Sequence, residues 1–73
     1  MKLYIVNIYI NYCVSIDLFI SMLDNEKYLQ IHIYPDKLQI YFDRYKKARD
    51  FKERYSEINW FGLTMGELYL AVV

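Results

Sequence analysis

The residues best suited to nucleophilic chemistry in this chain are its single cysteine and its single histidine. A thiol becomes a strong nucleophile when a neighbouring base takes its proton. Cys13 lies where a predicted strand ends, and His32 lies within LQIHIY on another strand, so the two could meet across a sheet. The sequence indicates no third group to orient the base. We therefore predict a buried, inert Cys13 and no catalytic role for His32.

Metal and acid–base chemistry also lack the residues they need. Zinc sites draw three or four Cys, His or carboxylate ligands, and one cysteine with one histidine does not suffice. The glycines, Gly62 and Gly66, are too few for a phosphate-binding loop. Capping and turn formation explain the carboxylates in turns and at a helix start more simply than catalysis, namely Asp24, Glu26, Asp36 and Asp43. The sequence predicts no enzymatic activity, no metal and no cofactor.

The nine tyrosines are the feature that points to binding. In KYLQIHIYPDKLQIYFDRY, aliphatic residues alternate with Tyr, His and Gln. A sheet covered only on its aliphatic side would expose the others on its second side, and tyrosine with scattered amides is typical of a contact surface. The candidate binding residues are Tyr9, Tyr28, His32, Tyr34, Gln39 and Tyr41. The alternative is structural: these rings shield the hairpin backbone or pack on the segment with Trp60 and Phe61.

The elements that position these residues begin with a strand over 3–12, which is rich in β-branched and aromatic residues. Residues 14–24 fit two patterns. Ser15 can cap a helix with Asp17 in its first turn, whereas strict alternation from Val14 to Met22 fits a second strand. We favour the helix, because the strand would need a tight turn without Gly or Pro.

The later elements are a hairpin, a helix and a closing strand. YPDKL predicts a turn between two strands in which Leu29, Ile31, Ile33, Leu38, Ile40 and Phe42 point inward. Residues 43–58 carry an apolar stripe at helical spacing and opposite charges four residues apart. Asn59 or Gly62 then ends the helix in the left-handed conformation. LTMG reads as a loop, and residues 67–73 as a strand. The alternative is a short helix capped by Thr64 together with Glu67.

This order predicts an α+β fold over residues 1–73 as one domain, with a mainly antiparallel sheet of about four strands covered on one face. The favoured arrangement is the βαββαβ order of ferredoxin-like folds. If residues 14–22 form a strand, the alternative is a β-meander followed by one long helix.

The apolar opening stretch predicts a folded core rather than a membrane span. It has the roughly 20 residues that a spanning helix needs, but Asp17 within it would cost roughly 2.5–3.5 kcal/mol near the helix centre. No small-residue cleavage site follows Ile10, as a secretory signal would require. We therefore expect a cytoplasmic protein that does not bind a membrane.

The balanced charge, nine basic against nine acidic residues, gives no long-range attraction for nucleic acid. A second hypothesis is nonetheless a single-stranded nucleic-acid binder or small regulator, in which the tyrosine face acts with basic residues of the predicted helix. The basic candidates are Arg44, Lys46, Lys47 and Arg49. Ion pairing on a solvated helix face explains these residues more simply, so this reading is not favoured.

We therefore expect a small, non-enzymatic interaction protein that blocks a surface of a larger protein or protein complex and forms a homodimer, which would support so small a core. Residue usage typical of AT-rich codons suggests a phage or mobile-element inhibitor of a host defence or regulatory machine, by analogy with the class of anti-CRISPR and anti-restriction proteins. A third hypothesis is a subunit of a structural oligomer.

Overall fold

The computed structural model describes residues 1–12 and 15–72, with the backbone but not the side chain of Trp60. Cys13 lies outside these residues, as does the packing predicted for the Trp60 ring. The elements follow the predicted βαββαβ order: β1 (Lys2–Ile10), α1 (Ile16–Met22), β2 (Gln30–Ile33), β3 (Lys37–Phe42), α2 (Tyr45–Arg54), a 3₁₀ helix (Asn59–Phe61) and β4 (Leu63–Val72). The predicted α+β fold class is confirmed.

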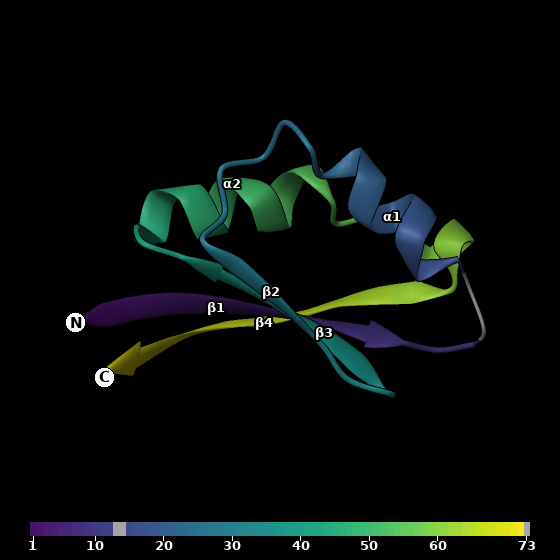
Figure 1. The fold of residues 1–73 in the computed structure, drawn as a ribbon, viewed down its shortest axis with the longest axis horizontal. Coiled ribbons are helices and arrows are strands. Elements are labelled where there is room, and N and C mark those ends of the chain that lie inside the picture. Colours follow the sequence, from purple (N-terminus) through teal and green to yellow (C-terminus); the bar gives the residue numbers. More distant parts are fainter. Residues whose placement is uncertain (13–14, 73) are drawn as a thin grey trace.

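The four strands form one antiparallel sheet in the order β2-β3-β1-β4. Both helices lie on the same side of this sheet, and the other side has no helix over it (Figure 1). Strands β1 and β3 are therefore central, while β2 and β4 form the two edges. We call the helix-covered side the inner face and the other side the open face.

The inner face carries the hydrophobic core. Alternation along β1 places Val6 and Ile8 there, opposite Ile40 and Leu38 of β3, and all four are fully buried. The helices add aromatic side chains to this layer. Phe51 of α2 lies with its ring centroid 5.2 Å from that of Phe42, and Phe19 of α1 lies 5.6 Å from Phe61. Burial of these apolar side chains supplies most of the driving force for folding.

Residues 16–22 form the favoured helix, which excludes the β-meander alternative. The Ser15 hydroxyl accepts a hydrogen bond from the Leu18 backbone N–H at 3.4 Å, as predicted for the cap. Phe19 of this helix and Leu23 at its C-terminal end are fully buried. The helix therefore forms where its cap and its apolar spacing agree.

The predicted inward direction is confirmed for Ile31, Leu38, Ile40 and Phe42. The prediction that Leu29 and Ile33 are buried was wrong. These two side chains are 52% and 58% exposed. The Leu29 N–H donates to the carbonyl of Tyr41, although Tyr41 is the register partner of Gln30. Two residues facing one is the geometry of a bulge, which breaks alternation before β2 begins. Ile33 is opposite Leu38, but the hairpin tip extends away from both helices (Figure 1).

The second half of the chain differs from prediction at two boundaries. Helix α2 spans Tyr45–Arg54, which is shorter than the predicted 43–58. A turn then leads into the 3₁₀ helix. Gly62 then adopts the left-handed conformation at φ 79°, as one of the two predicted residues. LTMG is not a loop: β4 already begins at Leu63, and the segment from Glu67 to Val72 is strand rather than helix.

Within residues 1–12 and 15–72, no helix combines the length and the apolarity needed to cross a membrane.

Candidate binding surface

The candidate site is the open face, where side chains from all four strands lie beside one another. Alternation places odd-numbered residues of β1 and β3 on this side, because their even-numbered neighbours face the core. The open face is formed by Ile5, Asn7, Tyr9, His32, Tyr34, Lys37, Gln39, Tyr41, Glu67 and Tyr69.

Ile5 shows how this face is covered without a helix. It is only 5% exposed, although it points away from the core. Its two cross-strand neighbours are Tyr41 on β3 and Tyr69 on β4. Directly opposite side chains in an antiparallel sheet lie close enough to pack on each other. The flanking tyrosine rings therefore shield an aliphatic side chain that would otherwise face water.

A buried amide pair lies next to Ile5. Asn7 and Gln39 are register partners and are 3% and 8% exposed. Gln39 Nε2 donates to Asn7 Oδ1 at 3.1 Å and to the Tyr69 hydroxyl oxygen at 3.1 Å. The Tyr41 hydroxyl donates to Gln39 Oε1 at 3.4 Å. Within the described chain, each buried side-chain nitrogen and oxygen has a partner, so the amides are buried without an unpaired polar group.

Glu67 extends this network towards the β4 side. Asn7 Nδ2 donates to Glu67 Oε1 at 2.6 Å, and the Tyr9 hydroxyl lies 2.7 Å and 2.9 Å from the two carboxylate oxygens. The hydrogen bond from Tyr9 lowers the pKa of Glu67, helped by backbone and Asn7 hydrogen bonds. The same contact raises the pKa of Tyr9, because ionisation would bring two negative charges together. The charged carboxylate and the neutral phenol thus stabilise each other.

A bulge in β4 makes room for this contact. The pairing of β1 with β4 shifts between Val6 and Ile8, so Gly66 and Glu67 together face Asn7. A Cβ atom on Gly66 would lie 2.5 Å from Tyr9 Cε2 and 2.8 Å from the backbone oxygen of Asn7. Only glycine therefore lets the Tyr9 ring lie against the β4 backbone and reach Glu67.

The hairpin end of the open face is aromatic. The ring of His32 lies 4.9 Å from Tyr41 and 6.4 Å from Tyr34, and is nearly parallel to the Tyr34 ring with an interplanar angle of 17°. Lys37 Nζ lies 5.8 Å from the centre of the Tyr34 ring, within cation–π range. Burial raises the pKa of Tyr41. The row of rings is continuous with the amide network through the Tyr41 hydroxyl.

Five of the six predicted binding residues meet on this face. Tyr9, His32, Tyr34, Gln39 and Tyr41 belong to it. Placing Tyr28 there was wrong, because its ring packs against the core on the inner face. The bulge before β2 is the reason, since it shifts the alternation on which that prediction rested.

Sequence reasoning missed the contributions of Glu67, Tyr69 and Lys37 to this surface. Glu67 was read only as a possible helix-capping residue, and the face of Tyr69 was not connected with the hairpin. A glycine inside a strand pattern marks a bulge, so Gly66 was the available signal that Glu67 and Tyr69 follow a shift in pairing.

The four predicted basic candidates lie apart from the open face. Arg44 is the N-terminal cap residue of α2, and Lys46, Lys47 and Arg49 are on this helix, which covers the inner face (Figure 1). Lys47 pairs with Asp43 at 3.0 Å, as predicted, and Arg49 lies 3.4 Å from Asp50. The tyrosines of the open face and these cations therefore occupy opposite sides of the molecule.

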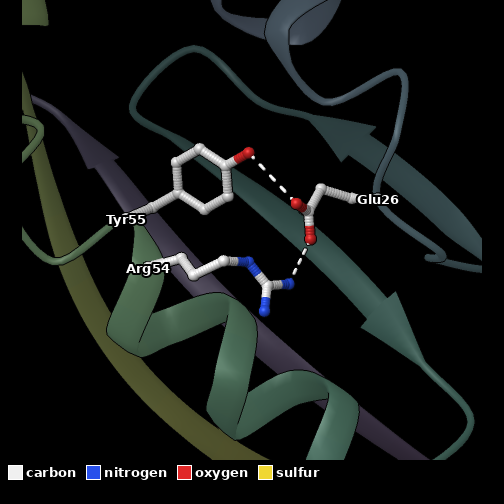
Figure 2. A network of polar contacts seen from close by, with 3 residues as sticks. All are labelled: Glu26, Arg54 and Tyr55. Carbon is white, nitrogen blue, oxygen red and sulfur yellow. Dashed lines mark hydrogen bonds and ion pairs between the residues drawn. The ribbon is translucent and has the colours of Figure 1, made fainter.

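A separate polar cluster on the helix side has a structural role. Figure 2 shows Glu26, from the segment after α1, between Arg54 and Tyr55 at the end of α2. The Tyr55 hydroxyl donates to Glu26 Oε2 at 3.2 Å, and Arg54 forms an ion pair with the other oxygen. This hydrogen-bonded pair raises the pKa of Arg54. The cluster ties the chain before β2 to α2, on the side where the Tyr28 ring packs.

The open face offers hydrogen bonding and aromatic contact. In the described parts of the chain, no three His, Cys, Asp or Glu residues gather closely enough to hold a metal ion. Comparison of the chain with protein-family models, with curated proteins and with solved structures finds no match.

Proposed function

We propose that this chain is a non-enzymatic interaction protein whose open face binds a surface of a larger protein or protein complex. The observation that supports this proposal is the network in which Asn7, Gln39 and Glu67 hold the surrounding tyrosines. Side chains that are already ordered lose less conformational entropy when a partner binds. Tyrosine is also enriched among the residues that contribute most to binding at protein interfaces.

The specific version of this proposal is a phage or mobile-element protein that acts in the host cytoplasm. It would occupy the working surface of a defence or regulatory machine, as anti-CRISPR and anti-restriction proteins do as a class. Its support is the residue usage typical of AT-rich codons. An inhibitor of this kind needs a well-ordered contact surface and no reactive group.

The test is to capture the partner with the tagged chain from extracts of the source host and then to compare substitutions on the two faces. Tyr34→Ala and Tyr69→Ala remove rings from the open face, each 39% exposed, whereas Tyr45→Ala removes a ring on the helix side that is 53% exposed. We expect each open-face substitution to weaken binding by about 5- to 30-fold, which corresponds to about 1–2 kcal/mol. Tyr45→Ala should leave the affinity unchanged.

Circular dichroism and urea unfolding should show that the three variants remain folded. If the open-face variants bind the captured partner like the unmodified chain while Tyr45→Ala loses it, the contact surface lies on the helix side and the proposal is wrong.

Single-stranded nucleic acid is the second candidate ligand, favoured by the row of rings from Tyr41 through His32 to Tyr34 with Lys37 beside it. Stacking of a base on such a ring contributes roughly 1–3 kcal/mol. The carboxylate of Glu67 on the same face would repel phosphate, which is why a protein partner is favoured. Oligonucleotide binding that falls steeply with salt would support this candidate, and no binding at low salt would exclude it.

A further inference from the structure

Strand β4 is the longer of the two sheet edges. It spans ten residues, whereas the opposite edge strand β2 spans four. No further strand lies beyond β4 in the part of the chain that the structure describes. An edge strand presents backbone N–H and C=O groups that can pair with another strand.

Two backbone hydrogen bonds of β1 show which residues of β4 present these groups. The Asn11 N–H donates to the carbonyl of Gly62 at 2.8 Å, whereas the Ile10 N–H donates to the carbonyl of Asp36 at 2.9 Å. Successive residues at this end of β1 therefore bond alternately towards β4 and towards β3, as antiparallel pairing requires. Because this alternation continues along the strand, the backbone groups of odd-numbered β1 residues bond to β4. Those of even-numbered β1 residues bond to β3.

The register then identifies the outward-facing residues of β4. Leu68, Leu70 and Val72 are opposite Val6, Tyr4 and Lys2, the even-numbered residues of β1. Their backbone N–H and C=O groups therefore point away from β1 at the free edge. Tyr69 and Ala71 lie between them and bond to β1.

The side chains of this segment favour pairing as well. Leu70 is 49% exposed and Val72 is 72% exposed, and both lie on the inner-face side of the sheet. Natural edge strands are commonly protected by lysine, proline or inward-pointing charges. The stretch from Leu68 to Val72, LYLAV, contains none of these, and the bulge that bends β4 precedes it. This apolar segment therefore lacks the common side-chain protections of an edge strand.

We propose that this segment pairs with the same segment of a second copy, antiparallel and around a two-fold axis at Leu70. Leu70 then faces Leu70 of the second copy, and Leu68 faces Val72, so the three residues that present backbone groups bond to one another. Tyr69 lies opposite the small Ala71 on the open face. The two Glu67 carboxylates lie about six residues apart along the strands, roughly 20 Å, so like charges do not meet. The arrangement is self-complementary, as a two-fold interface must be.

The size of this side of the molecule suits a dimer. The molecule measures 34 × 22 × 17 Å, and Figure 1 looks along the shortest axis with the sheet close to edge-on. The sides that carry the sheet edges are therefore the broad ones, 34 by 22 Å. A standard interface buries about 800 Å² on each partner, which is close to the full area of such a side, so the dimer would also use side chains around the paired edge. Pairing through one edge strand leaves the part of the open face around Tyr34 and Tyr41 accessible. Tyr69 belongs to both surfaces, so Tyr34→Ala tests the proposed function separately from dimer formation.

A groove beside the edge offers further contact. It has a volume of ≈ 480 Å³ and lies between α2 and β4, with Met65, Leu68 and Tyr45 among its lining residues and Arg49 and Lys52 beside them. In the paired arrangement Val72 of the second copy lies opposite Leu68 on this side of the sheet. The added strand would therefore bring an apolar side chain next to the groove.

The first test is the mass of the chain in solution, measured by sedimentation equilibrium. We expect the unmodified chain to have twice the 9.0 kDa mass of one copy. Leu70→Lys places two ammonium groups opposite each other at the axis and should weaken dimerisation at least tenfold. The control is Ile33→Lys, which adds the same charge at a 58% exposed position on the other edge and should leave the dimer intact. A monomer at all soluble concentrations, or a dimer that only Ile33→Lys disrupts, would overturn the proposal.

Amide hydrogen exchange of the unmodified chain tests the pairing without any substitution. In the proposed dimer the amides of Leu68, Leu70 and Val72 are protected together with those of Tyr69 and Ala71. If the edge is free, protection alternates, because only the amides that bond to β1 are shielded. A dimer with alternating protection would place the contact elsewhere and reject the β4 pairing.

Discussion

The inner and open faces of the same four-stranded sheet are both partly buried, but by different means. On the inner face, helices α1 and α2 cover aliphatic and phenylalanine side chains, which need only to exclude water. On the open face, Ile5, Asn7 and Gln39 are buried by their own strand neighbours, and the amides are paired with tyrosine hydroxyls and Glu67. A domain with too few residues for a second layer of helices can thus cover part of a second face with side chains alone.

The two faces also differ in what their residues can contribute, which is folding stability on the inner face and partner binding on the open face. The core residues of the inner face cannot meet a partner, because the helices lie over them. The tyrosines of the open face have both a neighbour to shield and an exposed edge, since Tyr69 is 39% exposed above a nearly buried Ile5. Substitutions on the two faces should therefore differ in size and in kind.

The largest effect is expected at the centre of the inner face. Phe51 is fully buried, with ring centroids 5.2 Å from Phe42 and 4.7 Å from Tyr55. Phe51→Ala should lower the free energy of unfolding by about 3–5 kcal/mol, because it leaves a cavity that its neighbours fill only partly. Urea unfolding measures this loss. A change below about 1 kcal/mol would show that α2 contributes little to the core.

A smaller effect is expected from the amide network of the open face. Gln39→Ala removes the partner of Asn7 Oδ1 and of the Tyr69 hydroxyl, and should cost about 1–3 kcal/mol because Asn7 stays buried. The matched control is Gln30→Ala, an exposed glutamine opposite Tyr41, which should change stability by less than about 0.5 kcal/mol. Equal effects in urea unfolding would mean that water replaces the Gln39 contacts without loss.

The smallest effect, and one that depends on pH, is expected at Glu67. Its pKa is lowered in the folded chain, so the carboxylate contributes stability above its unfolded pKa, near 4.5, and this contribution is lost as the pH falls through the folded pKa. The stability advantage of the unmodified chain over Glu67→Gln should therefore be constant at neutral pH and shrink below about pH 4.5. Urea midpoints from pH 7 to pH 3 measure it. An advantage that grows on acidification would contradict the assigned hydrogen bonds.

Sequence patterns predicted most of the inner face, because that face depends on periodicity within each element. Alternation in β1 and β3, the cap at Ser15 and the apolar spacing of Phe51 each follow from a few neighbouring residues. The open face was predicted as a set of tyrosines and amides, but not as a network, because its contacts join residues about 30 to 60 positions apart: Asn7 with Gln39 and Glu67, and Tyr9 with Glu67. The Tyr28 prediction was wrong where a bulge interrupted the alternation.

The sequence by itself therefore determined the order of the elements and the residues that share a face, since side-chain direction repeats every two residues in a strand and about every 3.6 in a helix. Tertiary structure alone decided which strands became neighbours, where alternation breaks at Leu29, where the pairing shifts at Gly66, and that Leu70 lies on a free edge. These features depend on the register between segments that are distant in the sequence. That register is set only when the strands pair and the inner face packs against the helices.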